Sequence, residues 1–314
     1  RPSVRLTALD IATTTKVAFS ASLSSSRSVR RTASAPAATA ADKIAIRWAG
    51  CSADVECSHR RPDGRFKEDM TRMTHFLASV RNRAEAETVL AAGADIVDLK
   101  EPGKGALGAV TPGDILDCLA AVGGRKPVSA TVGDLPMVPQ IVAEAVAATA
   151  ELGVDNVKLG ITPGGDPFTC FETLRDLGLR TGLILVFFAD EMPRFDPIDA
   201  AMVCGADGVM LDTAGKGNGA LPDHMTLHAI GRFIDRAHDA GLRAGVAGSL
   251  RAAHVKPLLG LRPDVIGFRG GLCRGGARGE NIDPQACARI GALVASSRED
   301  ADMRFEERSA STMC

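Results

Sequence analysis

The chain has 314 residues, of which 45% are hydrophobic, and this is enough for one large core or two small ones. Its 37 lysine and arginine residues nearly balance 38 acidic residues, so the net charge of −1 gives no reason to expect a nucleic acid or an anionic membrane as partner. With 33 glycines, one tryptophan and no tyrosine, the composition fits a parallel sheet covered by helices better than an all-β sandwich.

Residues 1–72 are rich in Ser, Ala, Thr and Arg, and residues 22–41 are of low complexity. No hydrophobic period persists there, so we expect disorder. The composition is also typical of a transit peptide. A non-native extension is the favoured interpretation, because the expected domain is complete from Met73 onward. Residues 298–314 are polar and are expected to form a frayed tail.

Between residues 73 and 297, short apolar runs alternate with helical patterns. The expected strands are residues 75–80, 94–100, 127–133, 156–160, 182–189, 208–212, 243–249 and 265–270. The helical patterns between them include residues 83–92, 139–152, 196–204 and 223–240. Strands that alternate with helices are parallel, and a spacing of about 20–35 residues between strands is the size of a βα unit.

Four helical segments end in a similar phrase before the next strand. The phrases are Ala-Gly-Ala-Asp at 92–95, Leu-Gly-Val-Asp at 152–155, Cys-Gly-Ala-Asp at 204–207 and Ala-Gly-Leu-Arg at 240–243. The glycine is expected to end the helix. Eight units in about 220 residues predict an α/β protein with a single (β/α)8 TIM barrel. The alternative, a doubly wound open sheet, usually has a G-x-G-x-x-G turn after its first strand, and residues 79–82 contain no glycine.

The eight cysteines form no C-x-x-C pair, and Cys51, Cys57 and His59 lack a second ligand pair at zinc-like spacing. We therefore expect no metal and interpret the cysteines as free thiols in a reducing compartment. No apolar run is long enough to cross a bilayer. A cytoplasmic protein without a membrane partner is the expectation.

Charged residues stand at the ends of three even-numbered strands, where a barrel carries its chemistry. Asp98 and Lys100 belong to the second strand, Lys158 to the fourth and Asp212 to the sixth. Because alternate strands share one layer inside a barrel, these side chains are expected to converge. A buried Lys–Asp ion pair that only holds strands together is the structural alternative.

The presence of two lysines favours catalysis over that alternative. A second ammonium nearby favours the neutral, nucleophilic form of the first amine. The aspartates can then orient the amines and move protons. The pattern predicts Schiff-base chemistry on a carbonyl compound. Lys216 lies in a Gly-Lys-Gly loop after the sixth strand and is expected to supply a further cation or part of a mobile lid.

The last two strands end in glycine-containing turns. Gly248 and Ser249 end the seventh strand, and Arg269, Gly270 and Gly271 end the eighth. Phosphate in barrels often binds after these strands on exposed N–H groups. These five residues are therefore predicted to bind a substrate phosphate, with ordinary tight turns as the alternative.

Several segments at these strand ends are similar to one known family. They are Ala-Asp-Ile-Val-Asp-Leu-Lys (94–100), Gly-Ala-Leu-Gly-Ala (105–109), Ser-Ala-Thr-Val-Gly-Asp (129–134), Val-Lys-Leu-Gly (157–160), Met-Leu-Asp-Thr-Ala (210–214), Ala-Gly-Ser-Leu (247–250) and Gly-Phe-Arg-Gly-Gly (267–271). The sequence resembles the (5-formylfuran-3-yl)methyl phosphate synthase family, also called 4-(hydroxymethyl)-2-furancarboxaldehyde-phosphate synthase. The resemblance covers residues 73–294 and not residues 1–72.

The resemblance implies a (β/α)8 barrel and a carbon–oxygen lyase that acts on phosphates. That reaction joins two glyceraldehyde 3-phosphate molecules into a furan, with release of phosphate and water and without a cofactor. The furan serves methanofuran, or its analogue, in the one-carbon metabolism of methanogens and methylotrophic bacteria. By resemblance, Lys100 forms the Schiff base and Lys158 accepts a proton, while Asp98, Asp212 and Lys216 assist.

Two other functions remain open. One is a class I aldolase of the deoxyribose-phosphate type, which also uses strand lysines. The other is a non-catalytic barrel that binds phosphosugars. In each case the partner is a small phosphorylated compound, and the sequence leaves a homo-oligomer open.

Overall fold

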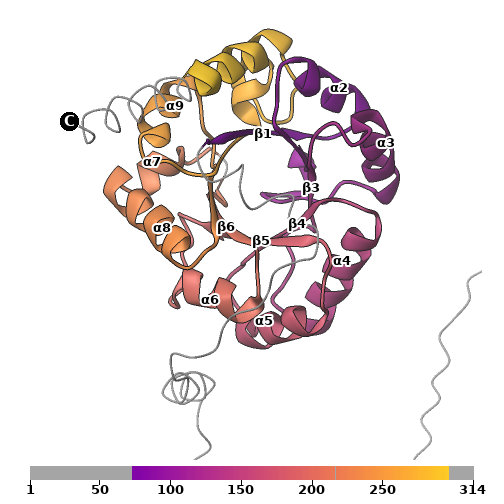
Figure 1. Ribbon diagram of the computed structural model, residues 1–314, viewed down its shortest axis with the longest axis vertical. Coiled ribbons are helices and arrows are strands. Elements are labelled where there is room, and N and C mark those ends of the chain that lie inside the picture. The colour runs from indigo at the N-terminus through magenta and orange to yellow at the C-terminus, as the bar shows by residue number, and fades with distance from the viewer. Residues whose placement is uncertain (1–72, 216, 297–314) are drawn as a thin grey trace, which may run out of the picture. The chain divides into compact units, whose positions relative to one another are not determined.

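The computed structural model describes residues 73–215 and 217–296, so the expected extension at residues 1–72 and tail at residues 298–314 lie outside the described residues. Eight parallel strands pair in chain order, and the last pairs with the first, which closes the sheet into a barrel (Figure 1). The strands are β1 (His75–Val80), β2 (Ile96–Leu99), β3 (Val128–Thr131), β4 (Asn156–Gly160), β5 (Gly182–Phe188), β6 (Gly208–Asp212), β7 (Arg243–Val246) and β8 (Val265–Phe268). The predicted (β/α)8 barrel is therefore confirmed.

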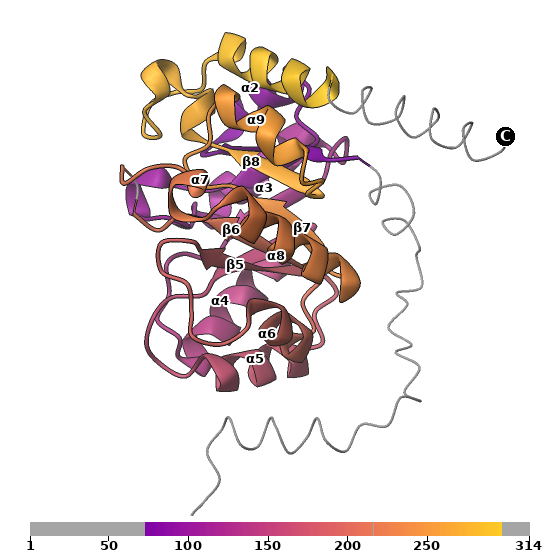
Figure 2. The same ribbon diagram turned by 90° about the vertical axis from the view of Figure 1, so that its left-hand side faces the viewer.

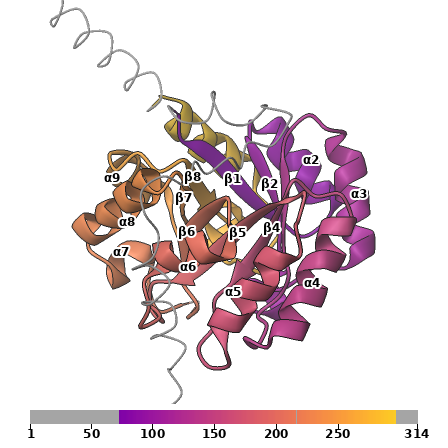
Figure 3. The ribbon, with the colours of Figure 1, turned by 60° about the horizontal axis from the view of Figure 1, so that its bottom comes forward.

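Helices follow the strands along the chain and cover the outside of the barrel (Figures 1 and 3). They are α2 (Arg83–Ala91), α3 (Pro112–Val122), α4 (Pro139–Glu151), α5 (Pro167–Asp176), α6 (Pro197–Cys204), α7 (Leu221–His224), α8 (Leu227–Asp239) and α9 (Ala252–Leu259), and residues 284–296 are also helical. The helices α3, α4, α5 and α6 begin with proline. Proline suits the first helical position, because its φ angle is already helical and its missing N–H would have no partner there.

The apolar core has two parts, one inside the barrel and one between the barrel and the helices. Along β5 the side chains alternate between them: Val186 and Phe188 pack inside, and Leu185 and Phe187 pack toward the helices. A strand that is apolar on both faces is typical of a parallel sheet covered by helices. Figure 2 shows the outer layer, in which α8 and α9 lie outside β7 and β8. None of the described helices combines the length and apolar character that a bilayer span requires.

The strand bounds agree with the sequence prediction for β1, β4 and β6, and the other strands are shorter than expected. The prediction of a single helix at residues 223–240 is wrong, because the structure has two helices there. Met225 has extended backbone angles and ends α7, and the Thr226 side chain accepts a hydrogen bond from Ala229 N to start α8. A threonine N-cap therefore divides what the apolar periodicity joins.

The glycines in the repeated phrases end their helices as predicted. Gly93, Gly153, Gly205 and Gly241 have φ angles of 84°, 89°, 71° and 71°. This left-handed conformation strains residues that carry a Cβ atom. The glycines thus turn the chain from the outer helical layer back into the next strand.

Candidate active site

Two lysine–aspartate pairs cross the interior of the barrel. Lys100 follows β2 and lies opposite Asp212 on β6, whereas Asp98 on β2 lies opposite Lys158 on β4. Neither pair joins neighbouring strands, so each contact spans the barrel interior. All four side chains are buried, with Asp98 fully inaccessible and Lys100 5% exposed. The structure thus brings together four of the residues that the strand-end pattern selects.

Asp98 is the most enclosed member of this group. Its Oδ1 atom lies 3.1 Å from Lys158 Nζ and accepts a hydrogen bond of 2.6 Å from Ser129 Oγ. Its Oδ2 atom accepts a hydrogen bond of 2.8 Å from Ser79 Oγ. Burial raises the pKa of Asp98, but the charges of Lys158 and Lys100 and the two serine hydroxyls outweigh it and hold the pKa below its usual range. Asp98 is therefore a carboxylate in the neutral pH range.

Lys100 is paired more loosely. Its Nζ atom lies 3.3 Å from Asp212 Oδ2, and Asp212 Oδ1 accepts a hydrogen bond of 2.7 Å from Thr213 N. The positive charge of Lys100 also acts on Asp98, so the two ion pairs share one electrostatic environment. Two amines and two carboxylates in a buried space can form an imine with a carbonyl and move protons around it. The catalytic roles of these residues remain predictions.

Lys216, which the sequence also selects, lies outside the described residues. The backbone immediately before it is anchored by Asp190, which follows β5. The Asp190 carboxylate accepts hydrogen bonds of 2.7 Å each from Ala214 N and Gly215 N. Burial raises the pKa of Asp190, but these backbone hydrogen bonds outweigh that effect and hold the pKa below its ordinary value. Asp190 therefore fixes the start of the loop that carries Lys216.

The turns after β7 and β8 lie against each other, as the phosphate prediction requires. A Cβ atom on Gly271 would lie 2.7 Å from Leu250 O. Gly248 and Ser249 have φ angles of 98° and 50°. A positive φ is unusual for serine and is found at strained functional turns. Among the described residues, the backbone N–H groups of Ser249, Gly270 and Gly271 have no hydrogen-bond acceptor.

Arg269, assigned above to phosphate binding, is placed differently by the structure. Its guanidinium is buried and contacts Glu85 through both carboxylate oxygens. The carbonyl groups of Ser79, Arg278 and Glu280 accept its remaining hydrogen bonds. Five contacts use the five N–H donors of an arginine. The structure therefore does not bring Arg269 to the glycine turns as a free cation.

Sequence reasoning did not select Ser79, Ser129 or Asp134. Asp134 follows β3 and accepts hydrogen bonds of 2.7 and 2.9 Å from Ala106 N and Leu107 N, which holds the loop after β2. Asp134 and Asp190 lie shortly after the ends of β3 and β5, so inspection of all eight strand ends would have found them. The two serines carry no such signal. Within the described ranges, no three His, Cys, Asp or Glu side chains are grouped to hold a metal ion.

Comparison with known proteins relates residues 76–291 to one family. These residues match the family model described as 4-HFC-P synthase. The chain is 36% identical over 215 residues to the (5-formylfuran-3-yl)methyl phosphate synthase of Methanopyrus kandleri, a match that covers 65% of this chain and 91% of that protein. It is 31% identical over 226 residues to the protein of the same name from Methanocaldococcus jannaschii, covering 65% and 92% of the two chains.

Solved structures with the same fold are more distant in sequence. The phosphoribosyl anthranilate isomerase from Thermus thermophilus aligns with a TM-score of 0.52 at 18% identity, covering 71% of this chain and 99% of that chain. The dihydrodipicolinate synthase from Bacillus clausii aligns with a TM-score of 0.51 at 13% identity, covering 76% and 79%. These similarities support the barrel fold and carry no information on the reaction.

Proposed function

The chain belongs to the 4-HFC-P synthase family, and from this we propose that it condenses two molecules of glyceraldehyde 3-phosphate into (5-formylfuran-3-yl)methyl phosphate. The relatives that carry this name are synthases. The observation that carries the proposal is the Lys100–Asp212 pair beside the Lys158–Asp98 pair inside the barrel. The enzyme would be a carbon–oxygen lyase that uses no redox cofactor. Its product would enter the synthesis of methanofuran or an analogue.

The reaction balances without an oxidant. Two glyceraldehyde 3-phosphate molecules, C3H7O6P each in the free-acid form, contain the atoms of the furan C6H7O6P, one phosphoric acid and two waters. Lys100 Nζ attacks the aldehyde carbon of one triose, the carbonyl oxygen leaves as water, and an imine forms. Asp212 lies 3.3 Å from this amine and can take up or return its proton.

The later steps require repeated proton transfer and loss of one phosphate. The enamine derived from the imine adds to the aldehyde of the second triose, which forms the new carbon–carbon bond. Lys158, held by Asp98, is suited to exchange protons with the bound intermediate. Elimination of one phosphate and loss of two waters during ring closure and aromatisation complete the furan. Hydrolysis of the imine then consumes one water, frees Lys100 and releases the aldehyde product, which leaves a net release of two waters. The free N–H groups of Ser249, Gly270 and Gly271 are suited to hold a phosphate during these steps.

Product analysis tests the overall reaction. With glyceraldehyde 3-phosphate as the only substrate, we expect a phosphorylated furan aldehyde with ultraviolet absorbance, the mass of C6H7O6P and one inorganic phosphate released for each furan. A hexose-type adduct that retains both phosphates would instead indicate a class I aldolase of the deoxyribose-phosphate type. Absence of any product would leave a phosphosugar-binding barrel.

Reduction with borohydride tests the Schiff base. The wild-type protein should retain the mass of a reduced triose adduct at Lys100. Lys100→Arg should abolish this adduct, because a guanidinium stays protonated and forms no imine. Lys104→Arg is the matched control, since Lys104 is an exposed lysine whose Nζ donates to Ala109 O within its own loop. An adduct that persists in Lys100→Arg would contradict the proposal.

A further inference from the structure

Two arginines after β8 differ in what their guanidinium groups contact. Arg269 directs all five N–H donors to protein acceptors. Arg278, nine residues later in the same loop, has one protein acceptor among the described residues, the carbonyl oxygen of Gly105 at 2.6 Å. Arg278 is only partly exposed, so its other donors are held near the barrel without a carboxylate partner.

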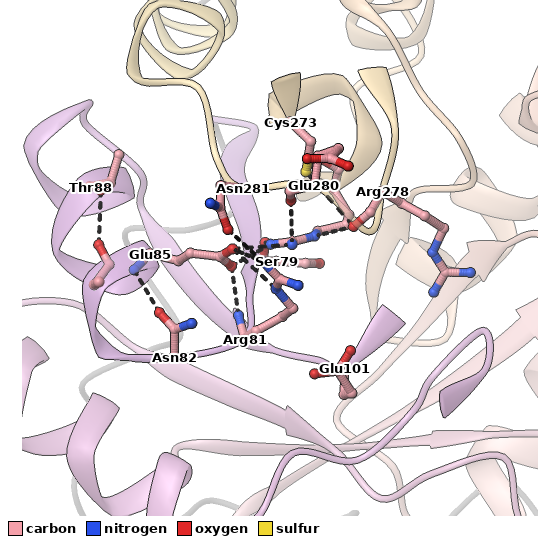
Figure 4. A network of polar contacts seen from close by, with 12 residues as sticks. Ser79, Arg81, Asn82, Glu85, Thr88, Glu101, Cys273, Arg278, Glu280 and Asn281 are labelled. Carbon is pink, nitrogen blue, oxygen red and sulfur yellow. Dashed lines mark hydrogen bonds and ion pairs between the residues drawn. The ribbon is translucent and has the colours of Figure 1, made fainter. Parts of the chain in front are cut away.

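The network around Arg269 fixes the backbone of Arg278. Arg269 Nε donates to Arg278 O at 2.9 Å, and Arg269 Nη2 donates to Glu280 O at 3.1 Å. Arg81 binds the same segment through Gly279 O and the Asn281 side chain. Figure 4 shows Arg81 and Asn281 beside Glu85, with the Arg278 side chain turned away from them.

The far end of Arg278 reaches the loop after β2. Gly105, which accepts its hydrogen bond, lies five residues after Lys100, and the next two backbone N–H groups are held by Asp134. A Cβ atom on Gly105 would lie 1.9 Å from Asp134 Oδ2, so only glycine fits there. Arg278 therefore bridges from the last strand to the loop that begins at Lys100.

Within the part of the chain that the structure describes, no carboxylate forms an ion pair with Arg278. Burial lowers the pKa of Arg278, because the charged guanidinium loses water. The negative charges of Asp212, Asp134 and Glu101 oppose this shift without forming an ion pair. Asp212 is also the partner of Lys100. Arg278 and the Lys100 amine thus share a negatively charged neighbour.

We propose that Arg278 binds the phosphate group of the triose whose aldehyde reaches Lys100. The inference rests on the proposed function, since it assigns a residue to the phosphate of that substrate. A guanidinium with several free donors suits two phosphate oxygens at once. Glyceraldehyde 3-phosphate carries its aldehyde and its phosphate at opposite ends of one short chain. A phosphate bound by Arg278 would therefore leave the aldehyde near the Lys100 amine. Arg269 then acts through Arg278, as a positioning residue.

The test compares a phosphorylated and an unphosphorylated aldehyde. Borohydride trapping is measured with glyceraldehyde 3-phosphate and with glyceraldehyde in the wild-type protein, in Arg278→Gln and in Arg278→Lys. Arg274→Gln is the matched control, because Arg274 is an exposed arginine of the same loop. Inorganic phosphate binding to each protein is measured by calorimetry, and circular dichroism confirms that each variant is folded.

Arg278→Gln should raise the half-saturating concentration of glyceraldehyde 3-phosphate by about 10- to 100-fold, the usual effect of removing a charge-assisted contact. The half-saturating concentration of glyceraldehyde should change far less than that of glyceraldehyde 3-phosphate, and phosphate binding should weaken. Arg278→Lys should lie in between, and Arg274→Gln should match the wild type. An equal loss with both aldehydes, or no loss, would overturn the assignment. If the wild type traps neither aldehyde, the proposed function fails, and phosphate calorimetry still decides the role of Arg278.

Discussion

The Asp98 carboxylate has no exposed surface and accepts hydrogen bonds from Ser79, Ser129 and Lys158. Removing a charged group from water costs several kcal/mol unless other groups replace the lost hydration. Here two hydroxyls and one ammonium do so, and the Lys100 charge contributes from farther away. Asp98 is therefore held as a permanent negative charge that keeps the Lys158 ammonium in the barrel.

Asp98→Asn separates proton transfer from imine formation. The amide keeps the shape of Asp98 but removes the negative charge 3.1 Å from Lys158 Nζ, so the charge that holds the Lys158 side chain in place is lost. Turnover should fall by about 10²- to 10⁴-fold, the usual contribution of a positioned acid–base group. Borohydride trapping at Lys100 should persist, because Lys100 pairs with Asp212. Asp212→Asn is the comparison variant and should impair trapping itself. Unchanged furan formation in Asp98→Asn would contradict the role of Asp98.

At the scale of single residues, the sequence predicts which charged side chains meet, but it does not predict the hydrogen-bond partners of each one. The lysines and aspartates are found because charged residues at strand ends are unusual and the alternation of strands gives their direction. Ser79 and Ser129 look like any small residue on a buried strand. The sequence prediction assigned Arg269 to phosphate binding and did not foresee its contact with Glu85. Glu85 lies 184 residues earlier, and nothing in the local pattern shows where the guanidinium points.

Four aspartates at the start of the even-numbered strands perform one structural task at the scale of the elements. Each carboxylate accepts a hydrogen bond from the backbone N–H near the start of the preceding strand. The pairs are Asp95 with Phe76, Asp155 with Val128, Asp207 with Leu183 and Asp264 with Ala244. Three of these aspartates belong to the repeated helix-end phrases. The phrase thus ends a helix with glycine and then fixes the neighbouring strand with aspartate.

Asp264→Ala tests this arrangement where it is most enclosed. Asp264 is 8% exposed, and its Oδ2 atom accepts from Ala244 N and lies 2.9 Å from His238 Nε2. The variant leaves a buried N–H without an acceptor, which costs about 1–3 kcal/mol of unfolding free energy. Urea unfolding followed by circular dichroism measures the loss. Asp264→Asn should lose less, since the amide oxygen can still accept, and the exposed Asp235→Ala should change little. Equal stability of Asp264→Ala and wild type would contradict the task assigned here.

The boundaries of helices and strands were predicted correctly where one sequence signal dominates. They were predicted wrongly where two signals compete. Proline and glycine mark the helix starts and ends on their own. In residues 223–240, the apolar periodicity of α8 hid the Thr226 cap, although threonine is a strong N-cap residue. The strands β2, β3, β5, β7 and β8 end before their predicted ranges do, and the last residues of each range belong to the loop that follows the strand.

For the whole barrel, closure depends on contacts between the two ends of the domain. β1 pairs with β8, and Arg269 from the β8 loop binds Glu85 on α2, which also binds Arg81 (Figure 4). Burial raises the pKa of Glu85, but hydrogen bonds and charge from Arg269, together with hydrogen bonds from Arg81, outweigh it and hold the pKa below its ordinary value. Because these residues are far apart in the chain, the pair forms only when the barrel closes.

Glu85→Gln should therefore destabilise the barrel in a pH-dependent way. Loss of one partner leaves Arg269 buried and unpaired, at a cost of about 3–5 kcal/mol at neutral pH. The folded-state pKa of Glu85 is depressed, so its contribution is complete above the ordinary value of 4.5 and is lost as the pH falls through the lower folded value. The unfolding free energies of wild type and Glu85→Gln should then converge in acid. The control Glu87→Gln removes an exposed pair with Arg83 and should differ little from wild type at any pH. A gap for Glu85→Gln that stays constant down to the lowest pH at which the barrel folds would show that its charge does not hold the ends together.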